Sequence, residues 1–153
     1  MPDPQPISDL KAHTGFWLRY VSNHVSQAFA RKVEELGVTV AEWVILRELY
    51  GPDTAAPSEL AERTGLTRGA VSKLGDRLIA KKLISRAFST EDRRWQTLAL
   101  TAAGRRLVPR LAKLADANDE QFFACLTSRE RAALLETLKK LVKLNELSTL
   151  PVD

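Results

Sequence analysis

Apolar residues recur every three or four positions in the first third of the chain, which predicts a long helix over residues 8–36. Gly37 follows as a C-terminal cap. A second helix is expected to begin at Thr39, because Thr39 and Glu42 have the spacing of a capping box. Val38 and Trp43 would form the hydrophobic staple around this box, and the breaker at residues 51–52 would end the helix.

The middle of the chain predicts two short helices followed by a hairpin. The first helix has Pro57 in its first turn and stops at Gly65. Thr67 would cap the second helix, which runs to about residue 82. Its inward stripe consists of apolar residues at helical spacing: Ala70, Val71, Leu74, Leu78 and Ile79. Residues 83–88 and 95–100 read as strands around a charged turn, with Leu98 and Leu100 on one face.

The last third predicts two more helices. Thr101 would cap a helix over 102–126, in which Pro109 predicts a kink or an interruption. Thr127 and Glu130 form another capping box, and a leucine-rich helix then runs to about residue 147. The expected fold is therefore mainly α with a small β-hairpin.

The two helices joined at Gly65 and Leu66 match a helix-turn-helix. The second helix of such a motif offers its outer, N-terminal side chains to the major groove of DNA. Small, polar or charged residues suit that outer face: Thr67, Arg68, Gly69, Ser72, Lys73, Asp76 and Arg77. Arg68 and Lys73 are suited to guanine edges or phosphates, and Gly69 permits close backbone approach.

The hairpin after this helix strengthens the interpretation, because a charged turn between two strands in this place is a wing. Arg93 and Arg94 at its tip suit a narrow, strongly negative minor groove. Asp92 would be repelled by phosphate on its own, so we expect it to pair with an arginine and fix its orientation.

The charge distribution agrees with a polyanionic partner. Nine basic and five acidic residues lie between Ser58 and Trp95, so this segment carries the whole net charge of +4. A solvated face without a partner would show the same charge. The N-terminus lacks the pattern of a signal peptide and no apolar run is long enough to span a membrane, which favours a cytoplasmic, nucleoid-associated protein.

Four segments together resemble the MarR family of bacterial transcriptional regulators. They are Ser58-Glu59-Leu60-Ala61-Glu62, Gly65-Leu66-Thr67-Arg68-Gly69-Ala70-Val71-Ser72, Asp92-Arg93-Arg94 and Leu98-Ala99-Leu100-Thr101-Ala102-Ala103-Gly104. The resemblance covers about residues 8–147. It implies a winged helix-turn-helix with a helical dimerisation lobe, bound as a homodimer to a pseudo-palindromic operator. The family's wing aspartate and second arginine fall on Asp92 and Arg94.

This chain departs from the family pattern at two positions. Lys82 stands where the family often has glycine, directly after the basic residue that closes the recognition helix. Gly75 stands mid-helix where a larger apolar residue is common, and such a glycine costs about 0.5–1 kcal/mol relative to alanine.

The expected organisation has two lobes. Residues 38–101 would form the DNA-binding lobe, residues 8–36 and 102–147 the helical dimerisation lobe, and residues 1–7 and 148–153 flexible tails. The apolar stripes of the outer helices need a partner, and a twofold dimer supplies one while placing two recognition helices about one DNA turn apart.

The family's ligands are often small aromatic acids or phenols, bound where the two lobes meet. Aromatic side chains suited to such a pocket lie on one stripe of the first helix: His13, Trp17, Tyr20 and His24. The same stripe is also explained by packing at a dimer interface. Trp43 and Arg47 are candidates to face the same cleft, although the staple position of Trp43 favours the core.

Two further interpretations remain open. Cys125, the single cysteine, would make the protein oxidant-responsive, but its apolar surroundings favour a buried, inert thiol. A non-specific architectural DNA-binding protein would share the basic segment and need no ligand. Catalysis is not expected, since the sequence contains no paired-carboxylate, nucleophile-elbow, phosphate-loop or metal-spacing motif and no cofactor is implied.

Overall fold

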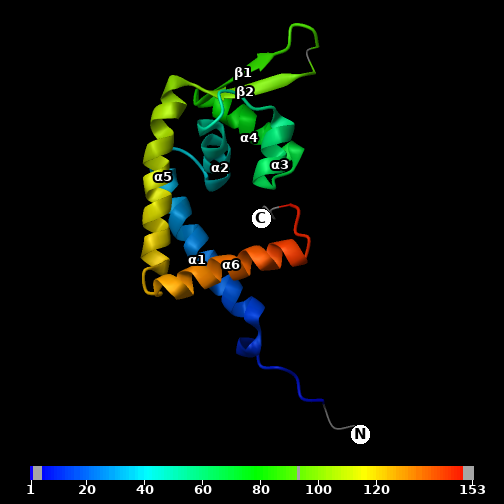
Figure 1. The fold of residues 1–153 in the computed structure, drawn as a ribbon, viewed down its shortest axis with the longest axis vertical. Coiled ribbons are helices and arrows are strands. Elements are labelled where there is room, and N and C mark those ends of the chain that lie inside the picture. Colours follow the sequence, from blue (N-terminus) through cyan, green and yellow to red (C-terminus); the bar gives the residue numbers. More distant parts are fainter. Residues whose placement is uncertain (2–4, 93, 150–153) are drawn as a thin grey trace.

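The computed structural model describes residues 1, 5–92 and 94–149, and this part of the chain forms six α-helices, one 3₁₀ turn and a two-stranded hairpin (Figure 1). In chain order the elements are η1 (Leu10–Ala12), α1 (Thr14–Glu34), α2 (Val40–Tyr50), α3 (Pro57–Thr64), α4 (Arg68–Ala80), β1 (Ile84–Phe88), β2 (Gln96–Leu100), α5 (Ala102–Phe123) and α6 (Ser128–Leu144). This is the mainly α fold with a β-hairpin wing that the sequence predicts.

Threonine caps start four of the helices. The side chain of Thr39 accepts a hydrogen bond from the backbone of Glu42 at 3.1 Å, and Glu42 returns the contact to the Thr39 backbone at 2.9 Å. Thr127 begins α6 with the same capping box, while Thr67 and Thr101 each accept one backbone hydrogen bond. These side chains satisfy helix N–H groups that would otherwise have no partner.

Two helix predictions are wrong in detail. The first helix does not begin at residue 8, because a 3₁₀ turn and an extended His13 precede α1. The indole N–H of Trp17 donates to the Lys11 carbonyl at 2.8 Å and stabilises this separate turn. The expected interruption at Pro109 is also absent, because α5 continues through it. Pro109 and Arg105 are both exposed, so water can hydrate the carbonyl that the missing N–H leaves open.

One core joins α1 to the winged part of the molecule. Its fully buried members come from the end of α1, from α2, α3 and α4, from β2 and from the first half of α5: Val33, Ile45, Leu46, Leu49, Leu60, Val71, Leu78, Leu98, Val108 and Leu111. Leu98 pairs with Ala55 through two backbone hydrogen bonds of 2.8 and 2.9 Å, which extends the hairpin by one bridge. Within the hairpin, Ile84 lies opposite Leu100 and Phe88 opposite Gln96.

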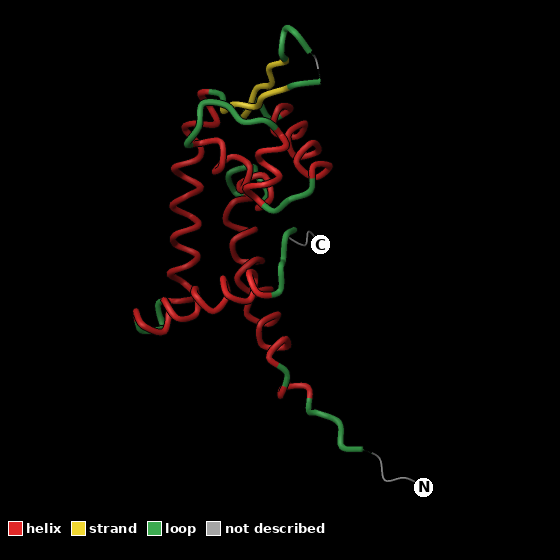
Figure 2. Tube along the Cα trace, turned by 45° about the vertical axis from the view of Figure 1, so that its right-hand side comes forward, coloured by secondary structure: helices red, strands yellow, loops and turns green. Residues whose placement is uncertain are grey.

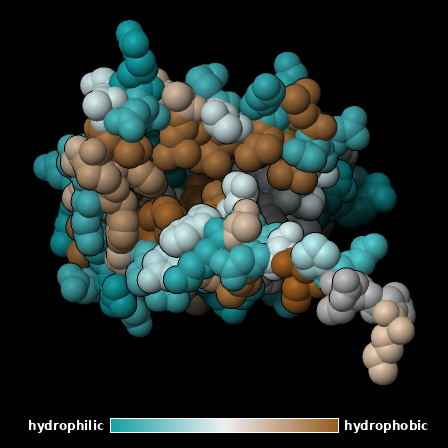
Figure 3. Space-filling view, turned by 90° about the horizontal axis from the view of Figure 1, so that it is seen from below, coloured by the Kyte–Doolittle hydropathy of each residue, from teal (hydrophilic) through white to brown (hydrophobic). Residues whose placement is uncertain are grey.

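The last helix lies apart from this core. In both backbone views α6 leaves the lower end of α5 and passes across α1 (Figures 1 and 2). No residue of α6 is buried, although the helix carries exposed leucines. Seen from below, hydrophobic residues surround a hollow on the surface of the molecule (Figure 3). Among the described residues, no helix has both the length and the apolar character needed to cross a membrane.

Candidate nucleic-acid interface

The turn between α3 and α4 sets the direction of the recognition helix. Gly65 adopts a left-handed conformation with φ of 76°, which glycine does without steric cost, and its N–H closes α3 on Ala61. Leu66 is buried after this turn, and Thr67 then caps α4. The chain therefore reverses sharply and leaves the first turn of α4 at the surface.

The recognition helix presents a polar outer face. Val71, Leu74 and Leu78 hold its inner side in the core. The residues expected on the outer side are all exposed: Thr67, Arg68, Gly69, Ser72, Lys73 and Arg77. These residues of α4 and its N-cap therefore lie at the surface, where they are accessible to a partner.

Asp76, also expected on the outer face, forms an ion pair with another residue of the protein. Its carboxylate accepts a 2.7 Å hydrogen bond from Arg86 of β1. This ion pair joins the middle of α4 to the first strand of the hairpin, so Asp76 helps to hold the wing against the helix. Sequence spacing alone does not reveal this contact, because the two residues lie in different elements.

At the wing, Asp92 binds Arg94 through several contacts. The Nε and NH2 groups of Arg94 lie 3.1 and 2.9 Å from the two carboxylate oxygens, and the backbone N–H of Arg94 donates to Oδ1 at 3.0 Å. These hydrogen bonds hold the pKa of Asp92 below its usual value, and the carboxylate raises the pKa of Arg94. The structure thus forms the expected pair.

This pair leaves the arginine available to a ligand. The Arg94 side chain is 90% exposed, whereas that of Asp92 is 31% exposed. A guanidinium held on one edge by a carboxylate loses less freedom when it binds a groove or a phosphate. Arg93, the other arginine of the expected wing tip, lies outside the described residues.

The wing and the recognition helix share one surface. Arg68 from the first turn of α4 and Arg94 from the wing line the same pocket of about 250 Å³, together with Ser58 and Trp95. Two cationic side chains from separate elements therefore border one space, where both could donate hydrogen bonds to an anionic group such as phosphate. The arrangement can bind an extended polyanion that contacts both elements at once.

Trp95 is a candidate contact that the sequence interpretation missed. The sequence pattern places it only at the start of the second strand, yet the residue is 66% exposed next to Arg94. An exposed indole beside a cationic residue has an apolar face and an N–H group with which it can contact a bound partner. Its position directly after the arginine pair was the available signal.

Of the aromatic stripe on α1, three members lie together. The ring centroids of Trp17 and Tyr20 are 6.3 Å apart, and those of Tyr20 and His24 are 5.1 Å apart. Tyr20 and His24 border an open pocket of about 310 Å³, which Phe122 of α5 completes. His13 lies before α1 and bonds the Leu10 carbonyl instead.

The two candidates on α2 do not join this stripe. Trp43 packs edge-on against Phe29 with a centroid distance of 6.3 Å, at the margin of the core. Arg47 is exposed one turn further along α2. Neither residue lines the pocket of Tyr20 and His24. The alternative assignment of Trp43 to the core is therefore the one that its packing supports.

The expectation for Cys125 is wrong, because the thiol is exposed. Helix α5 ends at Phe123, so Cys125 lies in the turn before α6 and not on a packed helical face. Its only hydrogen bond among the described residues is a 3.5 Å contact with the Phe122 carbonyl.

Comparisons with known proteins identify the family of this chain. Residues 36–94 match the model of the MarR family. The protein assigned as the transcriptional regulator of the hcr operon in Thauera aromatica is 30% identical over 130 residues, which cover 84% of this chain and 78% of that protein. The transcriptional repressor MdtR of Bacillus subtilis is 34% identical over 87 residues, covering 57% of this chain and 56% of the repressor.

The fold also matches that of Bordetella bronchiseptica BpsR, whose DNA binding is regulated by 6-hydroxynicotinic acid. The TM-score is 0.80 at 24% identity, and the match covers 89% of this chain and 97% of BpsR. This chain therefore belongs to the MarR family and is a DNA-binding transcriptional regulator with a winged helix-turn-helix fold.

Proposed function

We propose that the protein is a homodimeric repressor that binds a pseudo-palindromic operator and is released by a small aromatic or phenolic ligand. The observation that carries the DNA-binding part is the Arg94 guanidinium, held by Asp92 and bordering the same pocket as Arg68. In this proposal Arg94 enters the minor groove while α4 lies in the adjacent major groove.

The proposed DNA contacts divide between the two elements. On α4, the exposed outer residues contact bases and phosphates: Thr67, Arg68, Gly69, Ser72, Lys73 and Arg77. On the wing, Arg94 reads the minor groove, Asp92 orients it and Arg93 supplies a looser phosphate contact. Trp95 adds an aromatic contact to the sugar-phosphate backbone next to Arg94.

The unpartnered helices support the dimer. Leu135 and Leu138 on α6 are 53% and 37% exposed, and Trp17 and Val21 on α1 are 48% and 47% exposed. Large apolar patches of this kind mark protein interfaces. We therefore assign residues 8–36 and 102–147 to a dimerisation lobe and residues 38–101 to a DNA-binding lobe.

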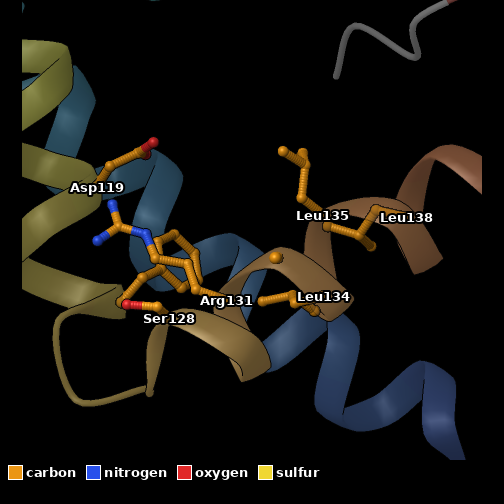
Figure 4. A pocket seen from close by; sticks show the side chains of 8 residues that line it. Asp119, Ser128, Arg131, Leu134, Leu135 and Leu138 are labelled. Atoms are coloured by element: carbon orange, nitrogen blue, oxygen red, sulfur yellow. The ribbon is translucent and has the colours of Figure 1, made fainter.

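A pocket at the base of α6 points to how a second copy would dock. It has a volume of about 320 Å³ and is bordered by Asp119 and Phe123 from α5 and by leucines of α6 (Figure 4). Leu135 and Leu138 line this pocket from α6 and are both exposed (Figure 4). An apolar side chain of a second subunit would fill this space and cover the leucines.

The aromatic side chains of α1 support a ligand site. Tyr20, His24 and Phe122 together offer two aromatic faces and a polar imidazole, which suits a flat molecule with one hydrogen-bonding group. The site joins α1 to α5, two helices of the proposed dimerisation lobe. A ligand that binds more tightly when the recognition helices are wrongly spaced for DNA would release the operator by differential affinity.

Selection from a random DNA pool tests the operator. The full-length protein should enrich a palindrome with half-sites about one helical turn apart. The affinity for that sequence should exceed the affinity for unrelated DNA by about a thousandfold or more at the same salt concentration. Equal affinity for selected and random DNA would instead make this a non-specific architectural protein.

Repeating the binding measurement with a panel of aromatic acids tests the ligand. The panel contains hydroxybenzoic acids and 6-hydroxynicotinic acid, with cyclohexanecarboxylic acid as the non-aromatic control. An active compound should weaken operator binding in the wild type and have less effect on a Tyr20→Ala variant. Unchanged operator affinity with every aromatic acid would remove the ligand from the proposal and leave the DNA-binding part intact.

A further inference from the structure

The recognition helix is joined at its C-terminal end to a distant part of the chain. Lys81 caps α4, and its ammonium donates one 2.8 Å hydrogen bond to Glu42 Oε1 and another of 2.8 Å to the carbonyl oxygen of Gly37. These acceptors lie 39 and 44 residues away in the sequence. One side chain therefore connects α4 to the start of α2 and to the turn that ends α1.

Glu42 is an unusual partner, because its side chain is completely buried. Its Oε1 atom also closes the capping box of α2, while Oε2 is buried and has no hydrogen-bond partner among the described residues. Burial raises the pKa of Glu42, but hydrogen bonds from Lys81 and Thr39 and the charge of Lys81 outweigh it and leave the pKa lowered. The carboxylate thus stays ionised beside Lys81, its ion-pair partner.

Gly37, the third residue of this contact, connects Lys81 to the end of α1. Gly37 has a φ of 82° and turns the chain from α1 into α2. Its carbonyl lies at the end of α1, where a cation also interacts favourably with the helix dipole. Movement of α1 relative to α2 therefore shifts the Gly37 carbonyl oxygen relative to Glu42 Oε1, the two oxygens that hold Lys81.

We propose that Lys81 and Glu42 are positioning residues for operator binding, which hold the end of the recognition helix against the junction of α1 and α2. They act through α4 and touch no DNA. This inference rests on the proposed function, because the orientation of α4 matters only if two recognition helices must fit one operator. It defines a route by which a shift of α1 reaches the DNA-contacting face.

The first test is a variant for which the positioning role and general electrostatics predict opposite changes in operator affinity. Glu42→Gln keeps the capping oxygen and the shape of the side chain but removes one negative charge. General electrostatics predicts that a less negative protein binds DNA more tightly. The positioning role predicts the opposite, with operator binding weakened about fivefold because a neutral amide oxygen replaces the carboxylate that forms the ion pair with Lys81. Tighter or unchanged binding by Glu42→Gln would overturn the proposal.

Lys81→Met is the second variant, and the salt dependence of its binding separates two roles. A lysine that contacts phosphate adds about one unit to the slope of log affinity against log salt. We expect Lys81→Met to weaken operator binding about tenfold and to leave that slope unchanged. A slope reduced by about one would show a direct phosphate contact and would contradict the positioning role.

Two controls complete the experiment. Lys82→Met removes the same charge one residue further along, where no contact with Glu42 exists, and should change binding less than about twofold. Lys81→Arg keeps a positively charged donor on a long side chain and should restore most of the affinity. An equal loss in Lys82→Met would attribute the effect to general charge and overturn the proposal.

Folding and the proposed function are checked separately. Far-UV circular dichroism and thermal unfolding identify any variant that fails to fold, and the double variant Glu42→Gln/Lys81→Met should then bind no more weakly than the worse single variant. Additive losses would show that the two residues act independently. If the wild type itself selects no operator, the proposed function fails, whereas a wild-type operator with unaffected variants rejects only the positioning role.

Discussion

The hydroxyl of Thr101 donates a 2.8 Å hydrogen bond to the carbonyl oxygen of Lys82, the residue that turns the chain from α4 into the hairpin. Lys82 has a φ of 61°, in the left-handed region that glycine adopts most easily. The contacts around it hold the turn, since its N–H donates to Ile79 and the next carbonyl, that of Leu83, accepts from the Thr101 backbone. The chain thus makes this turn without the glycine that the family often has there, at a cost in backbone strain.

Lys82→Gly should therefore stabilise the protein. Relief of the left-handed conformation is worth about 1–2 kcal/mol, and glycine loses about 0.5–1 kcal/mol more backbone entropy on folding. We expect a net gain of about 0.5–1 kcal/mol in the free energy of unfolding, which raises Tm by about 1–4 °C. Lys82→Ala is the control, because it removes the same charge and keeps the strain. Equal stabilisation by both variants would show that the gain came from the charge.

Alanine substitutions at Gly75 and Gly104 should change the free energy of unfolding in opposite directions. A Cβ at Gly75 would lie 3.6 Å from Leu98 Cδ1, an ordinary contact, so Gly75→Ala should stabilise α4 by about 0.5–1 kcal/mol. A Cβ at Gly104 would overlap the carbonyl oxygen of Leu83 and crowd Leu100, so Gly104→Ala should destabilise by about 2 kcal/mol or more. Urea unfolding of both variants measures the two signs, and a loss in Gly75→Ala would contradict the packing described for Leu98.

Local sequence rules predict much of the fold, because caps and helical periodicity act over three or four residues. Thr39, Thr67, Thr101 and Thr127 all cap the helices that they were expected to cap. The same rules misjudge Pro109, since they count its missing hydrogen bond but not its exposure to water. They also extend the first helix too far, because the turn held by the Trp17 indole has no helical signature.

In the DNA-binding lobe, too, local contacts are predictable from the sequence and contacts between distant segments are not. The pair of Asp92 and Arg94 is predictable because two residues separated by one position can meet within a single turn. Contacts between distant segments are not, and the buried Glu42 with its partner Lys81 is the clearest case. Glu42 is recognisable as a capping residue, but its complete burial depends on how α2 and α4 pack. The exposure of Cys125 likewise depends on where α5 ends.

The ion pair of Glu42 should give stability a particular pH dependence. A carboxylate whose pKa is lowered by folding contributes stability above its unfolded pKa and loses it as pH falls through the folded value. The stability difference between wild type and Glu42→Gln should therefore be constant near neutral pH and shrink below the ordinary glutamate pKa of about 4.3. Thermal unfolding from about pH 7 to about pH 3.5 measures this difference. A difference that grows on acidification would mean that burial, which raises the pKa, outweighs Lys81.

At the wing, Asp92→Asn should weaken operator binding although it removes a negative charge. The amide keeps an acceptor but loses the charge that holds the Arg94 guanidinium in place. We expect binding about three- to tenfold weaker, and a larger loss for Arg94→Ala with a salt slope reduced by about one. Glu91→Gln is a matched control, because the exposed Glu91 makes no ion pair among the described residues. It should bind DNA as well as the wild type or slightly better.

The leucine face of α6 gives a test of the dimer that does not depend on DNA. Leu135 is 53% exposed and α6 has no buried residue, so Leu135→Glu should leave each subunit folded. In a dimer the same change buries a carboxylate in an apolar interface, which costs several kcal/mol when no partner neutralises it. Sedimentation equilibrium should show a dimeric wild type and a largely monomeric Leu135→Glu variant.

Lys140→Glu is the control on the polar side of α6, where Glu136 and Lys143 also lie. It changes the net charge by minus two, more than Leu135→Glu does, but it adds no charge to the apolar face. We therefore expect Lys140→Glu to remain dimeric. A dimeric Leu135→Glu protein would place the interface elsewhere, and a Lys140→Glu monomer would show that net charge and not the leucine face governs association. Since one subunit carries one recognition helix, the monomeric variant should also lose the tight binding to a palindrome while retaining weaker binding to a half-site.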